Sequence, residues 1–503
     1  MPAMNSRRAF IATLFAGAVS LGLVACGDHA PGGDPPAVSC SPPPAPTVSS
    51  ATATASGSSP RVAVPAWSAD IGRPSAVVGG TVFGTAGAHC YEATDIATGD
   101  VDWTVGASSE HPWVFDVIAD NSTVLAAAGI QVGQAPAMVA SVVDQLVAYD
   151  PTTGHARWSI TIPNDGQRMP GLLTGSAVVV AEADGSLLGL NERNGHLLWR
   201  DPAPSGCGGN PMDGLQPDAA VIGVGSAGGD AVATVAFACP GGGSVAAVDP
   251  LNGARRWTWR IPTGWEVDPQ MTDEVDPGGS DRPAVAAAIG LTPPANAPAK
   301  VAPEPAPVLP TTLANAYGYA ETGNMVVLDA HTGHLRWDLS GLAGTILTVG
   351  GAGSICVLTD AGADCRAALD GTALWSTTWP GSGASATYPA LSCIDQSAGS
   401  QPCVVSANGL MYVAAATTSA PAYPPGPGPP TPGGSFVLTA LNMATGKTAV
   451  TIPLPAFDNS ESDHAVSLAL PPGILAVGDG TVLVSPQFDE TDVVQAFATQ
   501  ASG

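Results

Sequence analysis

The sequence is short of basic residues. Asp and Glu number 42 against 16 Lys and Arg, the formal net charge is −26, and Lys300 and Lys447 are the two lysines. No stretch has enough positive charge to follow a phosphate backbone, so the sequence predicts no nucleic-acid partner. The charge indicates a soluble body and says nothing about its fold. We expect a monomer.

Long apolar runs are equally scarce. Residues 9–25 are apolar and uncharged, and two arginines precede them. This order is typical of a signal peptide, here residues 1–25, and the run is short for a membrane span. The run ends in Leu-Val-Ala-Cys, which resembles a lipobox whose cysteine, Cys26, becomes acylated. We therefore expect an exported lipoprotein, anchored to a membrane through its lipid and facing the extracytoplasmic space, in the periplasm or at the cell surface.

The export route is left open by the residues around Arg7 and Arg8. Ser-Arg-Arg-Ala-Phe-Ile resembles a twin-arginine signal, which carries folded proteins, although Ala12 stands where a basic residue is common. A Sec signal that contains two arginines is the alternative.

Large apolar side chains are almost missing from residues 26–60, which are rich in Pro, Ser, Ala, Thr and Gly. Such a segment buries too little surface to offset its ordering entropy. It predicts a tether between the lipid and a folded body over residues 61–503.

Eight cysteines remain after Cys26, an even number that suits disulfides in an oxidising compartment. One pair flanks Val357–Asp364, which reads as a hairpin that places the two cysteines opposite each other. This pair is Cys356 with Cys365. Cys393 with Cys403 could close a short loop, and Cys207 and Cys239 lie in one repeat. Cys40 with Cys90 is then left by elimination. Isolated buried thiols are the alternative.

The folded body consists of repeats. Each copy has a short apolar strand ending in Asp or Asn, a turn with Gly, and a second strand with Trp four residues after the Gly. The copies cover Leu146–Trp158, Leu187–Trp199, Val245–Trp257 and Met325–Trp337, with weaker ones at Tyr91–Trp103, Cys365–Trp375 and Val437–Val450. The sixth has a shortened Asp370-Gly371 turn, and the last has Val450 in the place of tryptophan.

Physical chemistry explains this pattern as a hairpin. The Asp or Asn side chain can accept hydrogen bonds from turn amides, and Gly supplies positive φ. An indole is large enough to fill space between neighbouring sheets. We predict this structural role for Trp67, Trp103, Trp158, Trp199, Trp257, Trp337 and Trp375.

Repeat spacing indicates four-stranded blades. Gly154 and Gly195 are 41 residues apart, and Gly333 and Gly371 are 38 apart, close to the ~40–45 residues that one blade requires. Longer intervals carry insertions, which we expect to be loops near residues 265–312 and 420–434.

The two ends of the chain hold fragments of one more blade. Ile474–Val484 and Val493–Phe497 read as three strands that lack an outer Trp strand, and Val62–Trp67 reads as an outer strand without a blade. Joining them would close a ring and remove two sheet edges. We predict an all-β, eight-bladed propeller in which an N-terminal strand closes the last blade. Seven blades with a separately packed C-terminus is the alternative.

Strand-Asp-x-x-Thr-Gly-x-x-x-Trp at blade intervals resembles the pyrroloquinoline-quinone (PQQ)-like repeat family over residues 61–503. That family includes PQQ-dependent alcohol dehydrogenases and non-catalytic lipoproteins similar to the propeller subunit of the outer-membrane protein assembly machine. In the dehydrogenases, the resemblance implies a tryptophan floor, a disulfide between adjacent cysteines, and a calcium ion beside a catalytic Asp. This sequence has no adjacent cysteines, so no catalytic residue is carried over.

Other catalytic and metal-binding motifs are missing too: H-E-x-x-H, Cys-x-x-Cys, G-x-S-x-G and a Gly-rich phosphate loop do not occur. His155, His196 and His334 follow turn glycines and are expected at the surface, whereas His89, His111 and His464 read as isolated. We predict no metal site.

The lipid anchor, tether and propeller together favour a non-enzymatic scaffold that binds envelope proteins. No cofactor is predicted. One alternative is a PQQ- and calcium-dependent dehydrogenase, or a ligand sensor, with its site in the central channel. Another is a binder of cell-wall glycan, which aromatic residues on one face would favour.

Overall fold

The computed structural model describes a large part of residues 39–498. The described ranges are 39–40, 46–48, 65–70, 73–86, 89–132, 140–162, 171–204, 219–225, 232–237, 244–260, 265–267, 308–315, 322–329, 332–343, 347–351, 353–359, 362–378, 404–407, 409–416, 436–454, 473–478, 480–485 and 493–498. The predicted signal peptide, Cys26, and the predicted insertion at 420–434 lie outside these ranges. Over the ranges given, no helix is long and apolar enough to cross a membrane.

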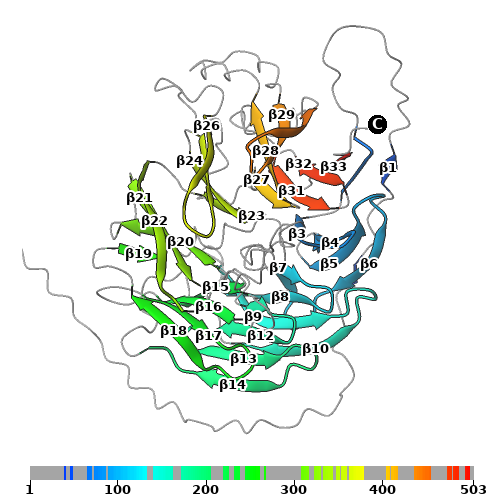
Figure 1. Ribbon diagram of the computed structural model, residues 1–503. Coiled ribbons are helices and arrows are strands. Elements are labelled where there is room, and N and C mark those ends of the chain that lie inside the picture. The colour runs from blue at the N-terminus through cyan, green and yellow to red at the C-terminus, as the bar shows by residue number, and fades with distance from the viewer. Residues whose placement is uncertain are drawn as a thin grey trace, which may run out of the picture. The chain divides into compact units, whose positions relative to one another are not determined.

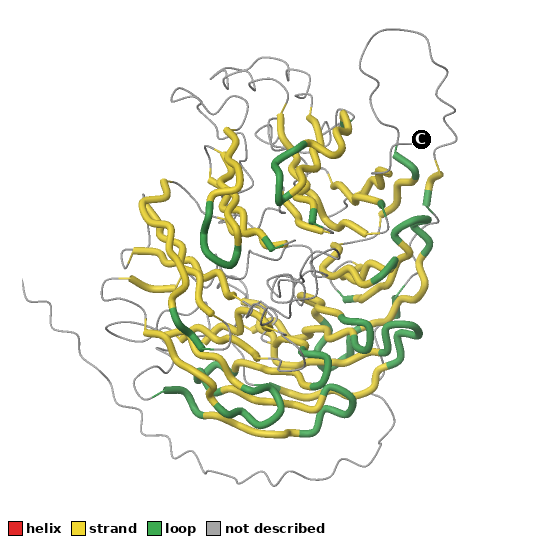
Figure 2. Tube along the Cα trace, in the orientation of Figure 1, coloured by secondary structure: helices red, strands yellow, loops and turns green. Residues whose placement is uncertain are grey.

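Every regular element in the described ranges is a β-strand, and Figure 2 shows strands joined by loops with no helix. The strands form seven antiparallel sheets of four and one of five (Figure 1). In chain order, the first sheet has β3 (Arg73–Val78), β4 (Thr81–Ala86), β5 (Cys90–Asp95) and β6 (Val101–Gly106). The second has β7 (Trp113–Ala119), β8 (Val124–Val132), β9 (Ala140–Tyr149) and β10 (Ala156–Thr161). The third has β11 (Gly171–Leu173), β12 (Ala177–Ala181), β13 (Leu187–Asn191) and β14 (Leu197–Asp201).

The fourth sheet has β15 (Ala219–Gly225), β16 (Val232–Phe237), β17 (Ser244–Val248) and β18 (Arg255–Arg260). The fifth has β19 (Trp265–Val267), β20 (Val308–Asn315), β21 (Thr322–Asp329) and β22 (Leu335–Ala343), and the sixth β23 (Leu347–Gly351), β24 (Ser354–Thr359), β25 (Gly362–Ala367) and β26 (Ala373–Thr378). The seventh has β27 (Val404–Ala407), β28 (Leu410–Ala416), β29 (Phe436–Asn442) and β30 (Thr448–Pro453). The eighth, called the closing sheet, has the order β1 (Thr47–Val48), β2 (Trp67–Asp70), β33 (Val493–Ala498), β32 (Thr481–Ser485) and β31 (Gly473–Gly478).

The closing sheet joins the two ends of the chain as the sequence predicted. Strand β2 pairs antiparallel with β33, with Trp67 opposite Ala496 and Asp70 opposite Val493. The predicted outer strand, Val62–Trp67, lies partly outside the described residues, and the described strand runs on from Trp67 to Asp70. In Figure 1 blue N-terminal strands lie beside the red strands β31–β33.

Each four-stranded sheet is a simple meander, and the first strand is the inner one. First strands of several neighbouring sheets contact each other, as in β3 with β7, β11 with β15, and β27 with β31. Strand β3 also contacts β31, so the first sheet meets the closing sheet. The last strands are outermost: β10, β14 and β18 alternate exposed residues with one buried tryptophan each. This is a propeller arrangement.

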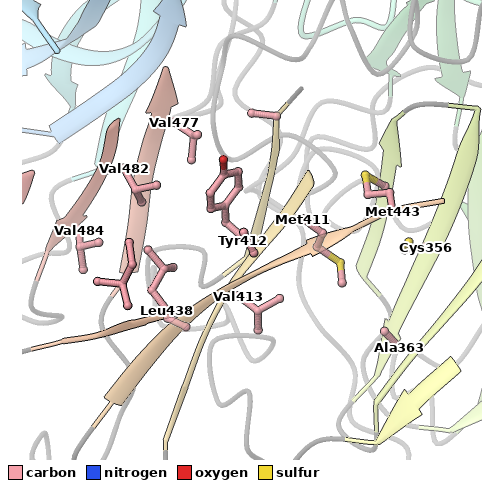
Figure 3. Close-up of a cluster of buried hydrophobic side chains, with 14 of the residues drawn as sticks. Cys356, Ala363, Met411, Tyr412, Val413, Leu438, Met443, Val477, Val482 and Val484 are labelled. Carbon is pink, nitrogen blue, oxygen red and sulfur yellow. The ribbon is translucent and has the colours of Figure 1, made fainter. Parts of the chain in front are cut away.

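Packing between sheets is apolar. A single buried cluster takes Cys356 from the sixth sheet, Met411 and Tyr412 from the seventh, and Val477 and Val482 from the closing sheet. Figure 3 shows these side chains converging from the three sheets. Protein interiors are close-packed with few voids, so these side chains from three sheets must fit together closely.

The predicted turn chemistry is present. The Asp95 Oδ1 atom accepts hydrogen bonds from the Ala97 and Thr98 amides at 2.9 and 2.8 Å. The Gly99 amide donates to the Asp95 carbonyl at 2.8 Å, and Gly99 has a φ of +77°. The side chains of Asp150, Asn191, Asp249, Asp329 and Asn442 accept from turn amides in the same way.

The sixth turn differs from the sequence interpretation. It was taken as shortened, but the Gly371 amide donates to the Ala367 carbonyl, so Ala367 occupies the Asp position of a turn of the usual length. The Asp370 side chain instead accepts from the Thr372 amide at 2.9 Å. The backbone fold of the turn therefore tolerates loss of the Asp side chain.

Each repeat tryptophan packs on the turn glycine of the next sheet. A Cβ added at Gly99 would lie 2.7 Å from the Trp67 ring, and one at Gly253 would lie 2.7 Å from the Trp199 ring. The same holds for Trp103 on Gly154, Trp158 on Gly195, Trp257 on Gly333, Trp337 on Gly371 and Trp375 on Gly446. Glycine is therefore required at this position of the turn for two reasons: the backbone has a positive φ, and an indole approaches too closely for a Cβ atom.

Indole N–H groups complete this contact. Trp67 Nε1 donates to the Ile96 carbonyl at 3.1 Å, and Trp199 Nε1 donates to the Pro250 carbonyl at 2.8 Å. Trp103, Trp158, Trp337 and Trp375 donate to carbonyls of the corresponding turns. The predicted role of these tryptophans between sheets is confirmed.

Two of the predicted disulfides occur among the described residues. Cys356 and Cys365 are directly opposite each other on β24 and β25 and are bonded. Cys40 is bonded to Cys90, at the start of β5.

The other two predicted disulfides stay predictions. They join Cys393 with Cys403 and Cys207 with Cys239, and all four of these cysteines lie outside the described residues.

Two expectations about segment boundaries change. Part of the predicted tether touches the folded body, because β1 pairs with β2 and Cys40 is bonded to Cys90.

The predicted insertion near 265–312 begins and ends inside strands, since β19 covers Trp265–Val267 and β20 starts at Val308. Trp265–Val267 pair with Leu313–Asn315 of β20 and so add a strand to the fifth sheet.

Candidate functional site

Successive strands of each sheet run in opposite directions, so the connections between strands lie alternately at one end of the sheet and at the other. Here "turn end" denotes the end with the Asp/Asn-Gly turns and the connections between first and second strands. "Loop end" denotes the opposite end, with the connections between second and third strands and between successive sheets. At the loop end lie the connections 133–139, 163–170, 202–218, 379–403, 417–435 and 455–472, and at the turn end lies 268–307. Binding residues are most often carried by such connections on a rigid scaffold.

A group of polar and aromatic side chains surrounds the connection between β6 and β7 at the loop end. The His111 Nδ1 atom lies 2.7 Å from Asp144 Oδ1 on β9, and the His111 amide donates to Ser108 Oγ. On the other side of the connection, His89 Nδ1 lies 2.6 Å from the Pro112 carbonyl oxygen, and the His89 ring is 4.8 Å from the Trp113 ring. The expectation that His89 and His111 are isolated was wrong.

These contacts hold the β6–β7 connection between two sheets, with His89 supplied by the first and Asp144 by the second. The pattern was invisible in the sequence because His89, His111 and Asp144 are far apart along the chain. No group of three or more His, Cys, Asp or Glu residues in the described ranges could hold a metal ion. The group is suited to fixing a connection or contacting a ligand at the loop end, and it assembles no catalytic triad.

Trp113 and Trp265, which are not repeat tryptophans, lie at the same end of the molecule. Trp113 is the first residue of β7 and Trp265 the first residue of β19. Both strands are the first of their sheets and start at the loop end. The sequence had left open which rim these residues occupy. Trp379 lies outside the described residues.

The repeat indoles and the two described disulfides do not supply the tryptophan floor and adjacent-cysteine disulfide that the dehydrogenase resemblance implies. Each repeat indole is packed on a turn glycine on an outer strand, so none is free to form a floor on the inner strands. The two disulfides described above join cysteines that are 50 and 9 residues apart, unlike an adjacent pair. We derive no reaction step through this cofactor.

A recurring ion pair marks the turn end. The guanidinium groups of Arg157, Arg256 and Arg336 lie 2.5–2.6 Å from the carboxylates of Asp150, Asp249 and Asp329, each seven residues earlier. A side-chain hydrogen bond from Arg157 is the main reason why the pKa of Asp150 is well below its usual range. Burial raises the pKa of Asp249, but the Arg256 hydrogen bond and turn amides outweigh it and the net direction is down.

The first repeat breaks this rule, because Asp102 stands where the arginine would be. Burial, and then repulsion from Asp95 and Asp100, raise the pKa of Asp102. The sequence alone contained this signal. Four repeats have Asp at the start of a turn of full length, and the residue seven positions after that Asp is Arg in three of them and Asp in the first.

Replacing Asp102 with arginine is expected to stabilise the protein by about 0.5–1 kcal/mol, the upper range for an exposed ion pair. The new guanidinium would reach Asp95 as Arg157 reaches Asp150. Chemical denaturation at pH 7 measures the gain, which should shrink in 1 M salt. Asp102→Asn serves as the control that removes repulsion without adding a pair. Equal stability of the Arg and Asn variants would contradict the ion-pair explanation.

A buried carboxylate connects the second and third sheets. Glu192, 2% exposed, accepts hydrogen bonds at Oε1 from the Ser122 and Thr123 hydroxyls. Its backbone carbonyl accepts from Trp158 Nε1 at 2.7 Å. Burial is the main cause that raises the pKa of Glu192; the two hydroxyl donors lower it and the nearby Asp120 carboxylate raises it further.

Replacing Glu192 with glutamine is expected to raise the melting temperature at pH 7. A carboxyl whose pKa is raised on folding binds its proton more tightly in the folded state, so its ionised form weakens folding. Its favourable contribution is present below the unfolded value of 4.5 and is lost as the pH rises through the folded pKa. Glutamine keeps the Oε1 acceptor and carries no charge.

Calorimetry between pH 4 and 8 measures this effect. The difference between variant and wild type should be largest at pH 7 and should disappear towards pH 4.5. Glu110→Gln, at an exposed position on the β6–β7 connection, controls for the loss of a negative charge elsewhere. A variant less stable than wild type at pH 7 would show that the ionised Glu192 contributes favourable hydrogen bonds.

An exposed apolar group lies at the turn end of the third and fourth sheets. Leu197 and Leu198 begin β14 and are 58% and 40% exposed, and Leu251 is 55% exposed. Trp199 follows the first two leucines and donates to the carbonyl of Pro250, the residue before Leu251. Two of the leucines thus precede the docked Trp199 in the chain, and the third follows the residue whose carbonyl accepts from it. At the same two positions β10 has Ala156 and Arg157, so β14 has lost the charge that its neighbour carries.

Comparison with known proteins identifies the repeats. Residues 64–273 match a family model, PQQ_2, described as outer membrane protein assembly factor BamB. No curated protein matches the chain.

Similar solved structures are distant in sequence. BamB from Moraxella catarrhalis is 15% identical, with 85% of this chain and 96% of that chain covered and a TM-score of 0.43. Quinohemoprotein alcohol dehydrogenase from Comamonas testosteroni is 12% identical, with 88% and 77% covered and a TM-score of 0.43. The computationally designed protein Ika8 is 13% identical, with 85% and 96% covered and a TM-score of 0.45. The family match confirms the resemblance read from the sequence over residues 64–273, which carry repeats of the PQQ-like propeller type.

Proposed function

We propose that this protein is an exported, lipid-anchored, eight-bladed propeller that serves as a non-enzymatic scaffold for other proteins of the cell envelope. The eight sheets are its blades, and the closing sheet is the blade shared by both ends of the chain. Cys26 is its lipid attachment site, and a Cys26→Ala variant should lose both the acyl mass and membrane association. The family match to BamB supports the scaffold role, since that family is described as an assembly factor.

The single observation that carries the scaffold proposal is the exposed group of Leu197, Leu198 and Leu251. These leucines lie on an outer strand and its neighbouring turn, and exposed apolar groups with polar surroundings mark protein-binding sites. Arg200 and Asp201 follow at the other end of β14 and are paired with Glu182 and Arg255, which gives the group a charged border.

Photo-crosslinking in intact cells tests this proposal. A photoreactive residue at Leu197 or Leu251 should yield a defined crosslinked protein partner, and the same residue at Leu374, exposed on the sixth sheet, serves as control. Leu198→Glu should reduce the Leu197 crosslink by tenfold or more. No crosslink at Leu197 or Leu251, or equal yield at all three positions, would refute a partner at this surface.

A PQQ titration separates the scaffold from the dehydrogenase or ligand-sensor alternative. The protein is mixed with PQQ and Ca²⁺, and absorbance and dye-linked alcohol oxidation are followed. Stoichiometric binding with turnover would overturn the scaffold proposal and place the site in the central channel.

A glycan-binding role is the second candidate, favoured by the placement of Trp113 and Trp265 at the loop end. Aromatic rings commonly stack on sugar rings because both present broad apolar faces. Pull-down on insoluble cell wall tests it, and Trp113→Ala should abolish retention if the glycan stacks there.

A further inference from the structure

The N-terminal segment is fastened to the propeller at three points. Cys40 is covalently bonded to Cys90. Pro46 lies against the turn glycine of the first sheet, so that a Cβ added at Gly99 would be 3.1 Å from the Pro46 Cβ. Thr47 and Val48 then pair with β2 as the outermost strand of the closing sheet. The segment is therefore attached to the folded body at Cys40, at Pro46 and at Thr47–Val48.

Strand direction shows where this segment leaves the propeller. Strand β5 runs from Cys90 at the loop end to Asp95 at the turn end, and the Ala107 amide donates to the carbonyl of His89, the residue before Cys90. Gly99, which touches Pro46, is at the turn end. The chain accordingly passes from the loop end at Cys40 to the turn end at Pro46.

Side-chain alternation places this passage at the junction of two sheets. Tyr91 faces the second sheet, where its hydroxyl donates to the Ala127 carbonyl at 2.6 Å. Successive side chains of a strand point to opposite faces, so Cys90 is on the face towards the closing sheet. Residues 47–48 also contact the closing sheet. The attachment points of the N-terminal segment therefore lie at the joint between the first sheet and the closing sheet, where the two ends of the chain meet.

Chain length then limits how the body can stand on a membrane. Cys40 is 14 residues after Cys26, which an extended chain spans in at most about 50 Å. Without the disulfide the next described contact is at Pro46, and without residues 46–48 it is at Ala66, 40 residues after Cys26, a reach of up to about 140 Å.

We propose that the Cys40–Cys90 disulfide is an orientation clamp that holds the loop end of the first and closing sheets towards the lipid surface and directs the turn end, with Leu197, Leu198 and Leu251, away from it. This inference rests on the proposed lipid anchor at Cys26. It assigns the membrane-near surface to the loop end and the protein-binding surface to the turn end, on opposite ends of the same sheets.

Energy transfer on vesicles tests the clamp. Full-length lipidated protein is placed in vesicles that carry a headgroup acceptor dye. A donor is introduced at one of two exposed sites, Glu110 on the β6–β7 connection at the loop end or Thr98 in the β5–β6 turn at the turn end. Transfer from Glu110 should exceed transfer from Thr98 at least twofold. Equal transfer from both sites, or more from Thr98, would overturn the proposal.

Two variants test the cause. In the protein with Cys40→Ser and Cys90→Ser the difference between the two donor sites should fall below half of its wild-type value. A 20-residue Gly/Ser insertion after residue 38 lengthens the tether with the disulfide intact, so it should reduce the difference without risk to folding. An unchanged difference in both variants would show that the disulfide and the short tether do not set the orientation.

A separate control distinguishes failure of the clamp from failure of the anchor. If the lipidated protein does not bind vesicles, the lipid-anchor proposal fails. The clamp is then measured on the chain attached through a His-tag placed at residue 26 to nickel-chelating vesicles, where the same twofold difference is expected.

Discussion

Replacing Trp67 with alanine is expected to lower the free energy of unfolding by about 3–5 kcal/mol, the usual cost of removing a large buried aromatic side chain. Trp67 is 1% exposed and is the most buried of the repeat tryptophans. Its ring packs on Gly99 and its Nε1 donates to the Ile96 carbonyl at 3.1 Å. The variant would lose apolar burial and one buried hydrogen bond at the joint between the closing sheet and the first sheet.

Urea denaturation followed by circular dichroism measures this loss. Trp375→Ala is the matched control, because it removes the same ring from the same kind of contact, on Gly446, at a half-buried position within the chain. We expect its cost to be smaller. If Trp67→Ala costs no more than Trp375→Ala, the joint between the chain ends is not more sensitive than an ordinary contact between sheets.

Deleting residues 61–70 should have the largest effect of all, abolishing the soluble folded state. The deletion removes β2, so β33 would expose an unpaired edge beside the apolar core that Trp67 shares with Val77, Val82 and Leu483. Exposed edges and apolar surface together favour aggregation. Expression yield, size-exclusion chromatography and the melting curve measure the outcome, and an unaltered melting curve would refute closure by the N-terminal strand.

A rescue variant makes this result specific. The same ten residues appended after Gly503 would follow β33 after the five residues 499–503, and β2 pairs antiparallel with β33 with Trp67 opposite Ala496. The appended strand could therefore reach its native position through a hairpin. Recovery of soluble protein with the native melting temperature is expected, whereas recovery by a scrambled sequence of the same ten residues would indicate a non-specific effect.

Local chemistry made much of the fold predictable. The Asp or Asn that ends a strand, the Gly at positive φ and the Trp four residues later are all neighbours in sequence, so one hairpin is specified by one short segment. The same reasoning found the Cys356–Cys365 disulfide, because a hairpin places two such residues opposite each other. It also found the composite closing sheet, because an incomplete blade at one end and a spare strand at the other complete each other.

Local reasoning was less accurate where tertiary contacts compete with it. The outer strand continues to Asp70, three residues past its predicted end at Trp67, because pairing with β33 extends that far. The sixth turn keeps its full length with Ala367 in the Asp position, since backbone hydrogen bonds suffice there.

By itself the sequence determined the repeat, the all-β class, the structural role of the tryptophans and the family resemblance, because each of these depends on residues within one hairpin or on its recurrence. Only the tertiary structure decided which turn each indole meets, that His89 and His111 hold one connection from two sides, and that Glu192 joins the second and third sheets. It also decided that Cys40 and the strand Thr47–Val48 attach at the joint between the first and closing sheets. These contacts join residues distant in the chain, and their partners are chosen by strand direction and sheet order, which no single segment encodes.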